Sequence, residues 1–254
     1  MKKHTLDAPK LKTVFWGLFL IIFSACSPQL HKSSGYELIA VDNSIAADQG
    51  FEQIIAPYKV KLDEEMNAVI ATSDRELPKG GRGETALGNL VADLQKEFSE
   101  EQFNRQIDIS VVNNGGLRNS LPQGNITVGN IFELAPFENF IYILELNAED
   151  VVRLGEYAVS GKNLGIAGMQ IEGKDNKLTH LSINGEELDT KRTYLLAIND
   201  YLANGGDRMD FLINLPRAEE STVLMREMLL TKMRELTAEG KTVNASIEGR
   251  QNYQ

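Results

Sequence analysis

Two apolar runs in this chain lead directly into glycine-rich polar loops. Residues 107–112 are apolar apart from one aspartate and one serine, and they run into a loop at 113–118; residues 194–198 run into a second loop at 199–207. β-Branched residues favour the pleated, half-buried surface of a strand, and paired glycines permit backbone angles that other residues avoid. The sequence therefore predicts two strands that each end in a tight polar loop.

Both loops carry groups that bind polar ligands. The first offers Asn113, Gly115, Gly116 and Arg118. Carboxamides, exposed backbone N–H groups and a guanidinium at a strand end suit a polar, anionic ligand. The alternative is an ordinary glycine turn whose asparagines only tolerate left-handed backbone angles. Two such loops in one chain favour the ligand site.

Helix and strand patterns alternate along the chain without a strict βαβ repeat, which predicts an α/β (α+β) fold with a mixed sheet covered by helices. We expect helices that begin after the N-caps Asp48, Thr85, Thr127 and Asn147, with a kink or interruption of the first at Pro57. The expected helices cover 48–66, 85–98, 128–134, 148–159 and 221–237. The expected strands cover 68–72, 107–112, 140–146, 168–172, 178–183, 194–198 and 243–247, with a further short one at 36–41.

Residues 1–25 have the pattern of a bacterial signal segment: lysines, then a short apolar run at 14–23. Ten helical residues span about 15 Å, too little for a bilayer core of ~30 Å. Small residues before Cys26, the only cysteine, indicate a lipoprotein signal that leaves a lipid on Cys26; the alternative is a plain secretory signal with a free thiol. We expect a tether over 26–47, one domain over 48–250, and a lipid-anchored place in the bacterial cell envelope, facing the periplasm or the surface.

The net charge of −10 argues against nucleic-acid binding, because an acidic surface repels phosphate backbones. The expected mature region is more acidic still, since the leader holds four lysines and one aspartate. A single nucleotide can nevertheless be held by a local cationic pocket.

Metal-dependent hydrolysis needs a set of ligands that this sequence does not contain. Its three histidines are His4 in the leader, His31 in the tether and His180 in an expected strand, and no Asp-x-His motif occurs. No phosphate-binding P-loop and no G-x-S-x-G elbow is present either. We therefore predict no catalytic residue and no metal ligand in this chain.

Four segments together resemble a known family. They are the segment 84–90, which reads ETALGNL, the loop at 113–118, the segment 134–139, which reads LAPFEN, and the loop at 199–207. In this order they are similar to the C-terminal, substrate-binding domain of the 5'-nucleotidase family, which includes bacterial UDP-sugar hydrolases. The resemblance covers about 48–249 and implies that family's fold. Gly88 in the first segment is expected to permit close helix packing rather than to contact ligand.

The resemblance implies a nucleotide site. Phe137 and Tyr201 match the two rings that sandwich the base, Tyr201 standing where many relatives have phenylalanine. Asp207 matches the acceptor of the ribose hydroxyls, and Arg118 with Asn113 matches the groups that hold the ribose, the base and nearby phosphate. The glycines permit close approach to the ligand. The other residues carried over are Gly115, Gly116, Asn204, Gly205, Gly206 and, at a spacing that differs from the family's, Arg82.

Each of these assignments has a structural alternative. Phe137 and Tyr201 could be core rings, Asp207 could bind only loop N–H groups, and Arg118 could pair with an acidic side chain. The coincidence of all of them in one chain favours the site.

We therefore expect a nucleotide or nucleoside-recognition module of a split 5'-nucleotidase. Divalent metals would be held by a separately encoded metallophosphatase, and this chain would hold no cofactor. The alternatives are a non-enzymatic nucleoside-binding envelope lipoprotein and a degenerate structural protein.

Overall fold

The computed structural model describes residues 39–40, 42, 44–161 and 163–254. The leader, Cys26 and most of the strand expected at 36–41 lie outside the described residues. The chain divides into two compact units, Met1–Phe51 and Glu52–Gln254, and the second holds the sheets described below. No helix among the described residues is long and apolar enough to cross a membrane.

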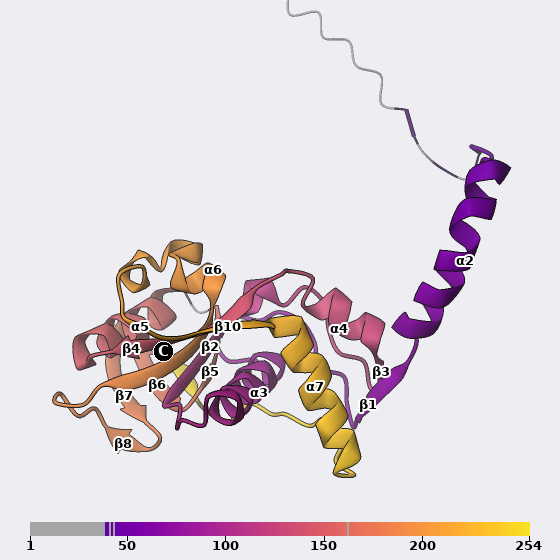
Figure 1. The fold of residues 1–254 in the computed structure, drawn as a ribbon. Helices are drawn as coiled ribbons and strands as arrows, with labels where there is room; N and C mark the ends of the chain where they lie inside the picture. Colours follow the sequence, from indigo (N-terminus) through magenta and orange to yellow (C-terminus); the bar gives the residue numbers. More distant parts are fainter. Residues whose placement is uncertain (1–38, 41, 43, 162) are drawn as a thin grey trace, which may run out of the picture. The chain divides into compact units, whose positions relative to one another are not determined.

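The larger unit is built around a mixed five-stranded sheet (Figure 1). Its strands, in spatial order, are β10 (Arg217–Leu224), β4 (Phe140–Leu146), β9 (Tyr194–Asn199), β2 (Ile109–Asn113) and β5 (Leu164–Ala167). Strands β2 and β9 are parallel, and the other neighbours are antiparallel. The prediction of a mixed sheet is confirmed.

Two smaller sheets flank this one. The first, in spatial order, contains β11 (Gln251–Tyr253), β6 (Met169–Lys174), β7 (Lys177–Ile183) and β8 (Glu186–Glu187). The second pairs β1 (Val69–Ser73) with β3 (Gly124–Thr127) in antiparallel fashion.

Helices cover the sheets, as the sequence predicts, and the helices of the described residues are α2 (Gln49–Met66), α3 (Ala86–Phe103), α4 (Val128–Leu134), α5 (Ala148–Gly161), α6 (Asp200–Ala203) and α7 (Met225–Ala238). α2 is the exception among them, since none of its residues is buried. Short 3-10 turns occupy Asn114–Gly116, Gly206–Arg208 and Asp210–Leu212. α3 packs on β2 and β5, and α5 packs on β6 and β7 (Figure 1).

Strand β2 is buried on both faces, which explains why it reads as an almost continuous apolar run. Because side chains alternate across a strand, Val111 enters a core cluster with Leu154 of α5, whereas Val112 enters a second cluster with Leu90 of α3 and Leu229 of α7. The strand that carries the first loop is therefore fixed from both sides.

A close backbone contact seats α3 against β5. A Cβ placed on Gly165 would lie 2.4 Å from the carbonyl oxygen of Gly88, and one on Gly88 would lie 3.0 Å from the Cα of Gly165. Only glycines allow this approach. The prediction that Gly88 serves packing is confirmed.

The predicted N-caps are present. Thr85 accepts a hydrogen bond from the N–H of Gly88 at 2.9 Å, and Asn147 accepts one from Asp150 at 3.0 Å. Thr127 forms a reciprocal capping box with Asn130. Asp48 Oδ1 accepts from the N–H groups of residues 50 and 51.

Three predictions about the bounds or continuity of helices and strands are wrong in whole or in part. The helix expected at 221–237 begins only at Met225, because residues 221–224 belong to β10, which pairs with β4, and this pairing outweighs local preference. The expected strand 243–247 is reduced to one bridge between Val243 and Ser73, and the C-terminal strand is β11. Of the kink or interruption expected at Pro57, the interruption is wrong, because α2 continues through this proline. The strands β3 and β5 were not predicted.

Candidate functional site

The two glycine loops meet because the strands before them are parallel neighbours. Ile109 of β2 pairs with Leu196 of β9, so the carboxyl ends of both strands, Asn113 and Asn199, lie at one edge of the sheet. Ligands of open α/β sheets bind in the crevice beyond such strand ends.

Two antiparallel strands bring further loops to the same edge. β4 begins beside the end of β9, with Ile141 opposite Asn199, so the segment that precedes β4 and carries Phe137 enters here. β5 begins beside the end of β2, with Leu164 opposite Asn113, which places Asn163 at this edge. The N–H of Asn114 donates to the carbonyl of Asn163 at 2.9 Å.

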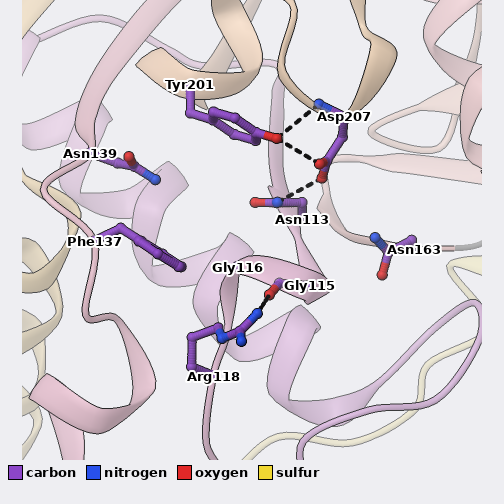
Figure 2. A pocket seen from close by; sticks show the side chains of 9 residues that line it. All are labelled: Asn113, Gly115, Gly116, Arg118, Phe137, Asn139, Asn163, Tyr201 and Asp207. Carbon is purple, nitrogen blue, oxygen red and sulfur yellow. Dashed lines mark hydrogen bonds between the residues drawn. The ribbon is translucent and has the colours of Figure 1, made fainter. Parts of the chain in front are cut away.

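Side chains from these loops enclose a cavity of about 460 Å³. Small-molecule pockets commonly measure about 300–1,000 Å³. The lining residues are Asn113, Gly115, Gly116, Arg118, Phe137, Asn139, Asn163, Tyr201 and Asp207 (Figure 2). The cavity is thus large enough for a nucleoside or a molecule of similar size.

The two aromatic residues are open to this cavity. The exposed fraction is 48 % for Phe137 and 47 % for Tyr201, so neither is a core ring. They reach the pocket from different segments, one ahead of β4 and one on α6, and lie on different sides of it (Figure 2). Aromatic faces of this kind can stack on a planar ligand.

Asp207 presents a carboxylate that is held by its neighbours. Its Oδ2 accepts a hydrogen bond from Asn113 Nδ2 at 2.8 Å, and its Oδ1 accepts one from the Tyr201 hydroxyl at 2.9 Å (Figure 2). An ionised carboxylate has about four acceptor positions. Two internal donors therefore leave room for hydroxyl groups of a ligand.

Arg118 brings a positive charge to the rim of the pocket. Its backbone N–H donates to the carbonyl of Leu134 at 2.8 Å, and its Nη1 donates to the carbonyl of Gly115 at 3.3 Å. The guanidinium carbon lies 5.9 Å from the centre of the Phe137 ring. Within the described part of the chain it forms no ion pair, so the guanidinium remains available to an anionic group.

Glycine is required at two positions because a neighbouring side chain lies too close for a Cβ atom. A Cβ on Gly116 would lie 2.7 Å from Oδ1 of Asn113, and one on Gly206 would lie 2.5 Å from Cε1 of Tyr201. Side chains at these positions would displace Asn113 and the Tyr201 ring. These glycines shape the pocket even though Gly206 does not line it.

Four residues that the sequence assigned to the site do not line this cavity. Arg82 lies at a separate hollow with Glu84 and Tyr253. The side chain of Asn204 accepts a hydrogen bond from Arg217 Nη2 at 2.5 Å. Gly205, with a φ of +90°, and Gly206 form the turn behind Tyr201.

Sequence reasoning missed Asn139 and Asn163, which do line the cavity. Asn139 directly precedes β4, and Asn163 directly precedes β5. Their place follows from strand pairing rather than from a local motif; the segment LAPFEN, which ends at Asn139, was the only available signal.

The residues that the structure describes contain no group of three or more His, Cys, Asp or Glu side chains placed to hold a metal ion. The pocket's titratable groups are a carboxylate, a guanidinium and a phenol. Groups of these kinds can bind and orient a polar ligand.

The chain is similar in sequence to known proteins. Residues 63–213 match the family model described as "5'-nucleotidase, C-terminal domain". A 5'-nucleotidase of Vibrio vulnificus is 27 % identical over 179 residues, which cover 66 % of this chain and 31 % of that protein. A cell wall protein of Listeria monocytogenes is 28 % identical over 189 residues, covering 67 % of this chain and 24 % of that protein.

The fold is also found among solved structures. The 5'-nucleotidase precursor from Thermus thermophilus superposes with a TM-score of 0.69 at 26 % identity, covering 82 % of this chain and 44 % of that one. The chain thus spans less than half the length of each of these three proteins.

Proposed function

Since this chain belongs to the family of 5'-nucleotidase C-terminal domains, we propose that it is the nucleotide-recognition module of a split 5'-nucleotidase. One observation carries the proposal. Two half-exposed rings, a fixed carboxylate and a guanidinium without an ion pair among the described residues line a single cavity. These are the groups that a base, a ribose and a phosphate require.

Each part of a nucleotide has a partner in the proposal. The base stacks between Phe137 and Tyr201, and stacking on an aromatic ring is worth about 1–3 kcal/mol per base. The ribose hydroxyls donate to Asp207, which Asn113 orients. Arg118 binds the phosphate by charge-assisted hydrogen bonds.

Hydrolysis would require metal ions from another polypeptide. Two divalent metals in a metallophosphatase domain would activate water beside the phosphate. In this proposal the present chain positions the nucleotide by its base and ribose, and the partner contributes the metal site. The relatives named 5'-nucleotidase support nucleotide catabolism as the setting.

We also propose an extracytoplasmic location with a lipid on Cys26. The signal-like leader and the small residues before Cys26 support it. A relative named as a cell wall protein is consistent with a place outside the cytoplasm. Metabolic labelling with a fatty-acid analogue should mark the wild-type chain and not a Cys26→Ser variant.

The proposal is tested by phosphate release from AMP. The purified chain alone should release none in the presence of Mg²⁺, Mn²⁺ or Zn²⁺, whereas addition of a matching metallophosphatase should give release that depends on Phe137 and Tyr201. Substantial metal-dependent release by this chain alone would contradict it.

A second candidate is a nucleoside-binding protein without enzymatic activity. It is favoured by a cavity that is complete within one chain. It predicts equal nucleoside affinity with and without any metallophosphatase, and no gain in phosphate release from such a mixture.

A further inference from the structure

The backbone that carries Asp207 adopts an unusual conformation. Asp207 has a φ of 53° and Arg208 a φ of 67°, both in the left-handed region that non-glycine residues rarely occupy. Such conformations cost free energy, which neighbouring contacts can offset. The chain has another such pair, Asp175 and Asn176, in the exposed turn between β6 and β7, away from the pocket. Residues in this state cluster at functional sites.

Two tyrosine hydroxyls bind this strained backbone. The N–H of Asp207 donates to the Tyr201 hydroxyl at 3.2 Å. The Tyr157 hydroxyl donates to the carbonyl oxygen of Asp207 at 2.8 Å. Tyr201 lines the pocket, but Tyr157 does not. Tyr157 projects from α5 and reaches the loop from outside the binding site.

Tyr157 is itself held firmly. It packs against the core cluster that joins α5 to the sheet, and its ring centre lies 6.3 Å from that of Phe211. Burial, and then the negative charge of Asp207, raise the pKa of the Tyr157 hydroxyl. The group therefore remains a protonated donor at neutral pH. A rigid helix thus supplies a fixed donor to a strained loop.

From this geometry we propose that Tyr157 is a positioning residue of the nucleotide site, which fixes the Asp207 backbone so that its carboxylate points at the ribose. This inference rests on the proposed function. Without the Tyr157 hydroxyl, the loop has one fewer contact to maintain its left-handed conformation, and the carboxylate loses its fixed direction. The two rings that stack on the base in our proposal are carried by other segments, Phe137 ahead of β4 and Tyr201 on α6, so stacking should change less than the direction of the carboxylate.

The consequence is selective. Loss of the hydroxyl should weaken binding that depends on the ribose hydroxyls and spare binding that depends on the base. The ratio of the affinities for adenosine and 2',3'-dideoxyadenosine isolates the first part, because the two ligands differ only in those hydroxyls. A purely structural role would lower both affinities equally.

The chain provides a matched control in Tyr194. Its hydroxyl also binds the backbone of one loop residue, accepting from the N–H of Asp189 at 2.7 Å and lying 3.3 Å from its carbonyl oxygen. Tyr194 is buried, packs in the same core cluster as Tyr157, and does not line the pocket. Tyr194→Phe therefore removes a comparable hydroxyl away from the site.

The experiment measures both affinities by calorimetry for the wild type, Tyr157→Phe and Tyr194→Phe. Tyr157→Phe should lower the adenosine-to-dideoxyadenosine ratio by about three- to ten-fold, the effect of one hydrogen bond. Tyr194→Phe should leave the ratio unchanged. In an Asp207→Ala background, Tyr157→Phe should have no further effect on it.

A second measurement needs no ligand. Hydrogen–deuterium exchange in the segment 206–209 should be faster in Tyr157→Phe than in the wild type and unchanged in Tyr194→Phe. An unchanged ratio, or an equal fall in both variants, would overturn the inference while leaving nucleotide binding intact. Absence of binding by the wild type would instead refute the proposed function. If hydrogen–deuterium exchange in Tyr157→Phe were then also unchanged, the role of the Tyr157 hydroxyl in holding the loop would be refuted as well.

Discussion

Arg118 is the positively charged side chain that lines the pocket, and its surroundings make it a phosphate ligand in our proposal. Its guanidinium donates to the carbonyl of Gly115 and lies over the Phe137 ring, with no acidic ion-pair partner among the described residues. An anion that enters the pocket therefore does not have to displace a carboxylate.

We expect Arg118→Gln to weaken binding of AMP by about 1.5–3 kcal/mol, the usual range for hydrogen bonds to charged groups. Binding of adenosine should change by less than about 0.5 kcal/mol, as for a substitution remote from a contact. The control is Arg105→Gln, since Arg105 pairs with Glu219 at 3.6 Å and does not line the pocket. An equal loss for both ligands would place Arg118 elsewhere than at the phosphate.

Sequence motifs identified most of the residues that line the pocket. Asn113, Arg118, Phe137, Tyr201 and Asp207 all line one cavity because each is tied to a strand end. Arg82 does not, since a sequence match at altered spacing does not fix where a loop points. Asn163 was missed because only the pairing of β5 with β2 brings it there.

At the scale of helices and strands, the position of the first loop depends on how α3 sits on the sheet. The backbones of Gly88 and Gly165 approach so closely that a single methyl group cannot be added without moving one element. β5 pairs with β2, and β2 carries the loop, so a shift here reaches the pocket.

Gly165→Ala should lower the free energy of unfolding by about 1–3 kcal/mol, the usual cost of overpacking. Its Cβ would lie 2.4 Å from a backbone oxygen that cannot rotate away. Gly161→Ala is the control, because the nearest atom to its Cβ would be 3.8 Å away. Urea denaturation provides both values, and equal stability of the two variants would show that the helix moves without cost.

α3 and α7 are joined by a nearly buried lysine. The side chain of Lys232 is 3 % exposed, and its ammonium lies 2.7 Å from Glu235, 2.8 Å from Glu97 and 3.1 Å from Glu101. Burial alone would lower the pKa of Lys232, but the hydrogen bonds to these glutamates outweigh it and raise the pKa. The lysine is thus charged at neutral pH.

Lys232→Met should destabilise the protein by about 1–3 kcal/mol, because three glutamates lose their common donor. Lys61→Met should change stability by less than about 0.5 kcal/mol, since Lys61 pairs with Glu65 at 3.9 Å on the surface. Thermal unfolding at pH 7 measures the difference. Equal midpoints would mean that the cluster adds nothing to the packing of the two helices.

Elements marked by their own residues were predictable. Thr85, Thr127 and Asn147 predict the starts of their helices, because an N-cap is a contact between residues close in sequence. β10 and β11 were not predicted, because their strand character comes from pairing with β4 and β6, which are distant in sequence. Residues 221–224 were predicted to begin a helix and form part of a strand for the same reason.

Across the whole molecule, an acidic chain of 254 residues with net charge −10 brings the residues that line its pocket to one edge of the sheet. Parallel pairing of β2 with β9 brings both glycine loops there. Antiparallel pairing of β4 with β9 and of β5 with β2 adds the other lining segments. In our proposal the groups gathered there bind a nucleotide.

The most direct test of that account is calorimetric titration of AMP into the wild type, Phe137→Ala, Tyr201→Ala and the control Phe132→Ala. Phe132 is also partly exposed, at 38 %, and contacts Arg226 rather than the pocket. We predict saturable binding by the wild type and by Phe132→Ala, with a loss of about 1–3 kcal/mol for each pocket ring. Absence of binding by the wild type, or equal affinity in all four proteins, would contradict the central claim.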